Sequence, residues 1–155
     1  MIYIAHRGNI RGALPERENH PDYITEALKK DFNVEVDIWY ENKKWILGHD
    51  SPQYEIDLHF LYNRFLWCHA KNIEALKEMS TRGIHCFWHQ SDDVVLTSQG
   101  YLWTYPGKLL TTKSICVNPE TIKNQDVDIC AGICSDYIED YRAGSVKNSL
   151  PIIRK

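Results

Sequence analysis

Ionisable side chains lie at or beside several short apolar runs of this sequence. Histidine titrates near neutral pH and can accept or donate a proton, whereas arginine and lysine can hold a phosphate group. Carboxylates two residues apart on a strand project from the same face and can share one divalent cation. Residues of these types predict a site for proton transfer and for binding a metal or an anion. They are His6 and Arg7, Glu35 and Asp37, His49, and His69 with Lys71.

The strand that carries the two acids is the clearest element. Residues 32–40 read FNVEVDIWY and alternate strictly, with apolar side chains on one side and Glu35 and Asp37 on the other. A solvated strand face normally mixes lysine, threonine and glutamate, but here the face opposite the acids is wholly apolar. We therefore expect both carboxylates to lie in a site.

Other segments have the periodicity of strands or of amphipathic helices. At residues 42–44 the chain turns back, so that the next strand forms a short hairpin with the acidic strand. Residues 50–64 have no clear pattern. The expected helices are Pro21–Lys30 and Ile73–Met79, and the expected strands are Ile2–Ala5, Phe32–Tyr40, Trp45–Gly48, Phe65–His69, Gly83–Trp88, Val94–Thr97, Tyr101–Thr104, Ser114–Asn118 and Ala131–Ser135.

Strands and helices alternate in the first half of the chain, which is typical of a parallel sheet built from βα units. A full barrel of this kind takes about 200–250 residues, whereas this chain has 155, so several crossovers must be short. We expect one α/β domain over residues 1–155, a small or incomplete TIM-type (β/α) barrel with shortened crossovers. In such a barrel the carboxyl ends of the strands share one rim, where the ionisable side chains would meet.

Composition narrows the class of protein. The chain is 43% hydrophobic and 25% charged, with a net charge of −3 and no basic cluster, which argues against a nucleic-acid partner. Neither a signal peptide nor an apolar run of about 18 residues is visible, so we expect a cytoplasmic protein without a membrane span. Five cysteines without paired spacing predict buried, reduced thiols. The unpaired edges of a truncated barrel favour a homodimer.

The order of the polar segments resembles the glycerophosphodiester phosphodiesterase family, which belongs to a superfamily with the phosphatidylinositol phospholipases C. IAHRGN, then Glu18-Asn19 opening a helix, then VEVDIWY and LGHD follow the family order of HRG, a PEN-like segment, ExD and HD. HAK at 69–71 falls where the family has Glu-x-Lys, and GICSDYIEDY at 132–141 resembles its late TDYP segment. The resemblance is strongest over residues 2–50, and the middle of the chain is shorter than in typical members.

The resemblance implies roles for individual residues. Two histidines would form an acid–base pair, cationic side chains would hold the phosphate, the glutamate before the first helix would belong to the site, and aromatic residues would shape the alcohol pocket. The implied residues are His6 and His49 as the pair, Arg7 and Lys71 on the phosphate, Glu18 in the site, and Trp103 at the substrate.

A divalent metal is the implied cofactor, with Glu35, Asp37 and His69 as ligands. Two carboxylates suit Ca²⁺ or Mg²⁺. His69 stands where the family has a third carboxylate, and an imidazole ligand favours Mn²⁺ or Zn²⁺. The identity of the metal, and the need for one, therefore stay open.

Three functions fit these residues. The first is metal-assisted hydrolysis of a glycerophosphodiester or a related small phosphodiester. The second is a metal-independent, phospholipase-C-like transfer that releases a cyclic phosphate, which the missing third carboxylate favours. The third is a non-catalytic protein that binds a phosphate ligand, against which the retention of both His6 and His49 argues.

A few further residues are weaker candidates. His89, Trp88 and Tyr105 could line the mouth of the pocket, and Asp136 ends a predicted strand on the same rim.

Overall fold

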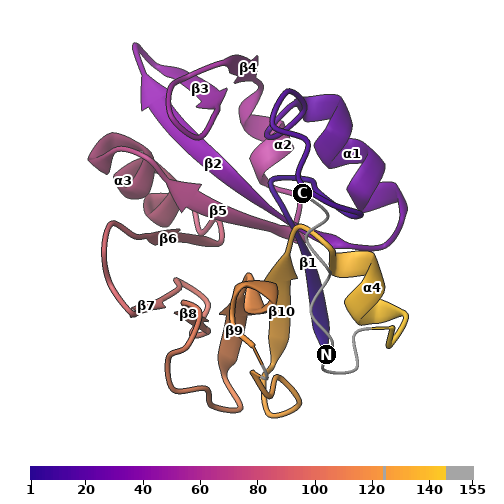
Figure 1. The fold of residues 1–155 in the computed structure, drawn as a ribbon. Coiled ribbons are helices and arrows are strands. Elements are labelled where there is room, and N and C mark those ends of the chain that lie inside the picture. Colours follow the sequence, from indigo (N-terminus) through magenta and orange to yellow (C-terminus); the bar gives the residue numbers. More distant parts are fainter. Residues whose placement is uncertain (124, 146–155) are drawn as a thin grey trace.

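The computed structural model describes residues 1–123 and 125–145 and shows a mixed α/β fold, with one curled sheet and few helices (Figure 1). The helices are α1 (Pro21–Lys29), α2 (Leu58–Leu61), α3 (Ile73–Thr81) and α4 (Ile138–Arg142), with one 3-10 turn, η1 (Pro119–Thr121). The strands are β1 (Ile2–His6), β2 (Asn33–Glu41), β3 (Lys44–Leu47), β4 (Tyr54–Ile56), β5 (Leu66–Ala70), β6 (Cys86–Trp88), β7 (Val94–Leu96), β8 (Leu102–Thr104), β9 (Ser114–Val117) and β10 (Gly132–Ser135).

The sheet is built around β1, and most of its strands are parallel. β1 lies between β2 and β10 and is parallel to both. On one side the parallel run continues through β5 to β6, and on the other it continues through β9 to β8. The hairpin β3–β4 extends from the far half of β2. The carboxyl ends of the parallel strands therefore face one end of the molecule.

The sheet has a seam between β6 and β7. β7 is antiparallel to β8, and no ladder joins it to β6 within the described ranges. Ser98, just after β7, bridges the seam: its backbone N–H donates to the Cys86 carbonyl (2.9 Å), and its hydroxyl oxygen accepts the Cys86 N–H (2.9 Å).

Alternate residues of each strand supply two separate cores. Outward side chains such as Val36 of β2 pack beneath helices α1 and α3, represented by Ile24 and Met79. Inward side chains form a mainly aromatic cluster that includes Trp67, Phe87 and Trp103. Side-chain caps fix the starts of three helices: the His20 ring accepts the Asp22 N–H at α1, Asp57 accepts the His59 N–H at α2, and Asn72 accepts the Ala75 N–H at α3.

The structure confirms most of the expected elements to within three residues, among them the hairpin of β3 with β2, and corrects two features. The segment expected to be irregular contains β4 and α2, and α4 follows the last strand. Beyond the expected hairpin, β4 and β7 also pair antiparallel, so the sheet is less parallel than expected. Residues 86–114 contain no helix, which confirms that the later strands connect through short loops.

Candidate functional site

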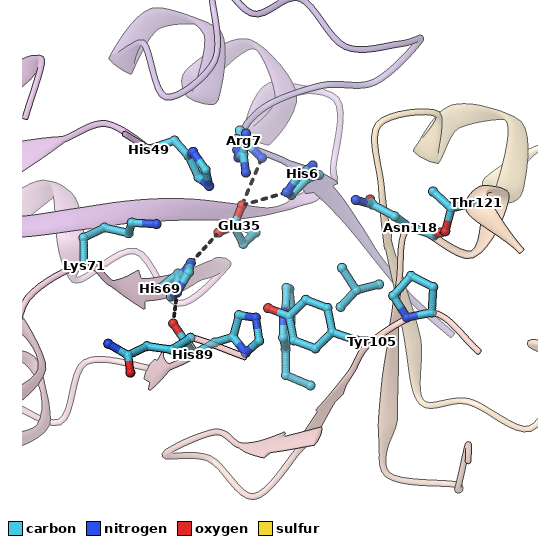
Figure 2. A pocket seen from close by; sticks show the side chains of 14 residues that line it. His6, Arg7, Glu35, His49, His69, Lys71, His89, Tyr105, Asn118 and Thr121 are labelled. Carbon is cyan, nitrogen blue, oxygen red and sulfur yellow. Dashed lines mark hydrogen bonds and ion pairs between the residues drawn. The ribbon is translucent and has the colours of Figure 1, made fainter. Parts of the chain in front are cut away.

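A cavity of about 430 Å³ opens at the carboxyl ends of the strands (Figure 2). It brings together predicted site residues that lie up to 97 positions apart in the chain, from His6 to Trp103. Asp37 and Glu18 lie behind this lining and contact it through Arg7. The cavity is lined by His6, Arg7, Glu35, His49, His69, Lys71, His89, Gln90, Trp103, Tyr105, Pro106, Val117, Asn118 and Thr121.

Strand register places the three predicted metal ligands side by side. Glu35 is aligned with His6 across β1–β2, and Asp37 is aligned with His69 across β2–β5. His69 Nδ1 lies 3.0 Å from Asp37 Oδ1 and 3.9 Å from Glu35 Oε1. One ligand atom from each of the three residues lies within 4.8 Å of the others, so the buried group could hold a metal ion.

Two details of this group fit a metal. The Nε2–H of His69 donates to the His89 carbonyl (3.3 Å), so Nδ1 is the ring nitrogen that faces the two carboxylates and could ligate a metal in place of its proton. Metal-binding histidines commonly have such a carbonyl partner on the other ring nitrogen. In addition, Asp37 Oδ1 is buried and accepts no hydrogen bond from any described residue. An unsatisfied buried carboxylate oxygen is costly unless a cation or a donor meets it.

The two carboxylates differ in electrostatics although both are buried. Burial, together with the charge of Asp37, raises the pKa of Glu35. Burial also disfavours the charged form of Asp37, but the contact with His69 and the charges of Arg7 and Lys71 outweigh it and hold its pKa well below the usual range. Asp37 is therefore the permanent anion of the group, and Glu35 is the carboxyl that a cation would help to ionise.

The two cationic side chains are held against these acids. Arg7 Nη1 donates to Glu18 Oε2 (3.0 Å) and Arg7 Nε lies 3.3 Å from Asp37 Oδ2. Lys71 Nζ lies 3.6 Å from Asp37 Oδ1. The backbone of Arg7 has φ +52°, a left-handed conformation that arginine rarely adopts, and its N–H donates to Glu35 Oε2 (3.2 Å). Such strain is characteristic of functional sites.

The two histidines of the expected acid–base pair have different partners. His6 Nδ1 pairs with Asp136 Oδ1 (2.8 Å), and His6 Nε2 lies 4.0 Å from Glu35 Oε2. Burial lowers the pKa of His6, but the Asp136 hydrogen bond and the Glu35 charge outweigh it, so the net shift is upward. Burial lowers the pKa of His49, although its Nδ1 lies 2.7 Å from Asp50 Oδ1.

Two buried asparagines that the sequence did not single out organise the loop 7–20. The Asn9 amide donates to both Glu18 (2.9 Å) and Asp136 (2.8 Å), which links the Arg7 and His6 partners. Asn19 clamps Asp37, because its oxygen accepts the Asp37 N–H (2.9 Å) and its amide donates to Asp37 Oδ2 (2.8 Å). The sequence could have indicated these two asparagines because they stand beside HRG and Glu18. Their roles were not predictable, because the residues that they contact are distant in the sequence.

The opposite wall of the cavity is aromatic and amide-rich. His89 and Tyr105 stack with ring centroids 3.9 Å apart. Trp103 reaches the cavity but is only 2% exposed, and its ring packs on Phe87. Asn118 also lines this wall, a role that the sequence did not indicate. Trp88 instead packs against the outer core.

None of the three comparisons, with family models, with curated proteins and with solved structures, gave a match for this chain. The family resemblance therefore rests on the motifs quoted above. No helix within the described ranges is long and apolar enough to cross a membrane. All five cysteines are buried and none forms a disulfide.

Proposed function

We propose that this protein is a metal-assisted phosphodiesterase, a short TIM-type relative of the glycerophosphodiester phosphodiesterases. The observation that carries the proposal is one cavity lined by His69, Glu35, His6, Arg7 and Lys71, with Asp37 and Asp136 directly behind this lining. A solvated surface would not bury these groups against one another.

The charge of the site supports a divalent cation and an anionic substrate. When bound, Mg²⁺ or Ca²⁺ would stabilise negative charge on a phosphoryl oxygen, and Mn²⁺ or Zn²⁺ would do the same. Four carboxylates face two permanent cations and the protonated His6, which leaves an excess of one negative charge once a bound cation has ionised Glu35. The carboxylates are Glu18, Glu35, Asp37 and Asp136, and the cations are Arg7 and Lys71.

The opposite pKa shifts assign the two proton-transfer roles. His6, whose pKa is raised, is the protonated acid that donates Nε2–H to the leaving alcohol oxygen. His49, whose pKa is lowered, is the neutral base that takes a proton from the attacking water molecule. Environments that separate two pKa values in this way are the usual mark of an acid–base pair. Arg7 and Lys71 hold the phosphate between them.

The first experiment is hydrolysis of a panel of small phosphodiesters, followed with EDTA and with each of Mg²⁺, Ca²⁺, Mn²⁺ and Zn²⁺. We expect metal-dependent turnover that falls by about 100-fold or more in His6→Ala and in Glu35→Gln. His59→Ala, which removes an exposed histidine of α2, is the control. Turnover that is unaffected in both site variants would refute the proposal, and binding without any product would favour the non-catalytic function.

A metal-free transfer is the second candidate, and one contact favours it. Lys71 and Arg7 already lie at the two oxygens of Asp37, so side-chain cations could replace a metal in balancing that carboxylate. This mechanism predicts turnover in EDTA and a cyclic phosphate product. Phosphorus NMR of the reaction mixture distinguishes a cyclic ester from a monoester.

A further inference from the structure

The seam between β6 and β7 has the topology of a β-hairpin whose two strands are only partly joined. β6 belongs to the parallel set of strands, and β7 runs against that set, so the chain reverses direction across residues 89–93. The Ser98 N–H donates to the Cys86 carbonyl (2.9 Å), as it would in such a hairpin. Beyond this contact, no backbone hydrogen bond joins the two strands in the part of the chain that the structure describes.

On β7, the backbone groups that face the seam belong to Val94 and Leu96. The Thr97 N–H donates to the Tyr101 carbonyl (2.8 Å), so Thr97 directs its backbone groups toward β8. In an antiparallel pair these groups alternate in direction from one residue to the next. The N–H and C=O groups of Leu96 and, two residues earlier, of Val94 therefore point away from β8 and toward the seam. They form no backbone hydrogen bond with any described residue.

On β6, the corresponding groups belong to Cys86 and Trp88. The Cys68 N–H donates to the His85 carbonyl (3.1 Å), so residues 85 and 87 direct their backbone groups toward β5. By the same alternation, residues 86 and 88 direct theirs toward the seam. Cys86 uses both of its groups on Ser98, whereas those of Trp88 have no backbone partner among the described residues.

The contact at Ser98 sets the register in which the seam would close. Two residues further along each strand Trp88 faces Leu96, and two residues beyond that pair Gln90 faces Val94. The connection that remains between the last pair has three residues, a length that is common in β-hairpins. Both strands therefore present free backbone groups at the positions that a regular hairpin would join.

The side chains of the two strands already lie on the faces that this register requires. Directly opposed residues of a hairpin share one face. Phe87 and Val95 belong to the inner aromatic cluster, so Trp88 and Leu96 lie on the outer side. Trp88 packs against the outer core there, and Leu96 is 67% exposed. Closure would place Leu96 beside the Trp88 ring without turning any side chain to the opposite face.

Closure of the seam is connected to the metal group through His89. This residue lies between the two strands and lines the cavity, and its carbonyl accepts the His69 Nε2–H (3.3 Å). A cation held by His69 Nδ1 is bound best when that carbonyl keeps the ring in place. A bound cation therefore favours arrangements in which His89 is fixed, and a hairpin paired on both sides of residue 89 fixes it.

We propose that β6 and β7 close into a regular hairpin when a divalent cation occupies the group of Glu35, Asp37 and His69, and that closure completes a barrel of the eight strands β1, β2 and β5–β10. The inference rests on the proposed function, because the cation is the metal of the proposed enzyme. A ligand shifts a conformational equilibrium only through different affinities for the two states. Here the contact of His69 with His89 supplies that difference, and closure covers an unpaired sheet edge.

Hydrogen exchange of single amides, followed by NMR on the full chain, measures closure. The metal-free protein is compared with protein saturated with Mg²⁺, Ca²⁺ or Zn²⁺, and a rise in Tm shows which cation binds. With such a cation, we expect exchange at the amides of Trp88, Val94 and Leu96 to slow by at least about tenfold. The amide of Gln99, in the exposed turn after β7, lies outside the pairing and should exchange at an unchanged rate.

Leu96→Pro separates closure from binding. Proline is tolerated on an edge strand where the N–H makes no hydrogen bond, as at Leu96 in this structure, but it cannot donate within a closed hairpin. We expect the metal-free Tm to stay close to that of wild type and the slowing at Trp88 and Val94 to be lost. Leu96→Ala, which keeps the N–H, should retain the slowing, and Glu35→Gln, which alters the cation group, should abolish it.

The outcomes separate this inference from the function on which it depends. A cation that raises the Tm without slowing exchange at Val94 and Leu96 overturns closure and leaves the proposed function intact. If no cation raises the Tm, closure and the metal-assisted mechanism are both overturned. Exchange that is equally slow with and without the cation, or slowing that persists in folded Leu96→Pro, also overturns closure. Slowing that increases with protein concentration would assign the edge of β7 to a second copy of the chain instead.

Discussion

At the scale of single residues, partners rather than residue types set the chemistry of this site. His6 and His49 are the same side chain, but His6 pairs with a partly buried carboxylate whereas His49 is near the almost fully exposed Asp50. The opposite pKa shifts follow from that difference and from burial. A hydrogen bond to a carboxylate stabilises the charged imidazolium, and desolvation destabilises it.

Asp136→Asn tests the role of the carboxylate behind His6. The amide oxygen still accepts the Nδ1–H, but the negative charge that raises the pKa of His6 is gone. If His6 is the acid, activity falls as pH rises through its pKa, so the alkaline limb of the kcat/KM profile should move to lower pH, with a rate loss of about 100-fold. An alkaline limb that keeps its position would show that Asp136 does not control His6.

Asn19→Gly tests the clamp on Asp37. Glycine tolerates the φ of +61° at this position, so the change removes two hydrogen bonds to Asp37 without straining the backbone. We expect a loss of about 2 kcal/mol in unfolding free energy and a 10- to 100-fold loss in metal affinity, read as the metal concentration that gives half of the thermal stabilisation. Asn42→Gly is the matched control, and equal metal affinity in both would contradict the clamp.

The sequence predicts the parts of the site that depend on nearby residues, and it does not predict contacts between residues that are far apart in the chain. The acids of β2 and the histidines at strand ends are visible because strand periodicity is local. Asn9 and Asp136 lie 127 positions apart, and their hydrogen bond exists only because β1 and β10 are neighbours. Asn118 reaches the cavity through an unusual φ that no periodicity reveals.

At the scale of elements, register decides which side chains meet. The parallel pairing of β2 with β5 aligns Asp37 with His69, and a shift of one residue would turn both carboxylates of β2 toward the outer core. A long strand such as β2 was predictable, because strict alternation of apolar and polar residues is visible in the sequence itself. The three-residue β4 and the four-residue α2 were not, because such short elements are stabilised by tertiary contacts rather than by their own pattern.

Ser98→Ala tests the seam between β6 and β7. The substitution removes the oxygen that accepts the buried Cys86 N–H and leaves the backbone bond from Ser98 in place. We expect a loss of about 1 kcal/mol in unfolding free energy and a lower Tm by about 2–4 °C. Ser91→Ala at an exposed position is the control; the same small effect in both variants would mean that the seam contributes nothing.

At the scale of the whole molecule, the helical cover is uneven. α1, α3 and α4 pack on the first strands and on β10, whereas residues 86–114 contain no helix (Figure 1). Val94 and Leu96 of β7 are consequently exposed, at 41% and 67%. The shortened crossovers were predictable from chain length, and their position was predictable from the close spacing of the later strands.

His85 makes the stability of the whole fold depend on pH. The Thr97 hydroxyl accepts the Tyr101 N–H (3.2 Å) and lies 3.0 Å from His85 Nε2, and burial lowers the pKa of His85 to about 4. The unfolded chain takes up this proton near pH 6.5, so stability is complete above that pH and falls as pH drops toward 4, by about 2 kcal/mol.

Chemical denaturation of wild type and His85→Gln between pH 7.5 and 4 measures this dependence. Glutamine does not titrate, so the difference in unfolding free energy between the two proteins should shrink as pH falls. A difference that is constant with pH would show that His85 has the same pKa in both states.

The origin of the two cavity walls in different parts of the chain also has a consequence for how such a protein can diversify. In the proposed enzyme, bond cleavage would depend on cavity residues before residue 72, with Asp136 behind His6, whereas the opposing wall comes from residues 89–121, where loops join β7, β8 and β9. Insertions and substitutions in those loops leave the catalytic strands undisturbed, because they alter neither the register nor the pairing of β1, β2 and β5. If residues 89–121 were exchanged between two homologues, the substrate preference would therefore move with the exchanged segment. The metal requirement and the pH profile would remain those of the protein that received the segment.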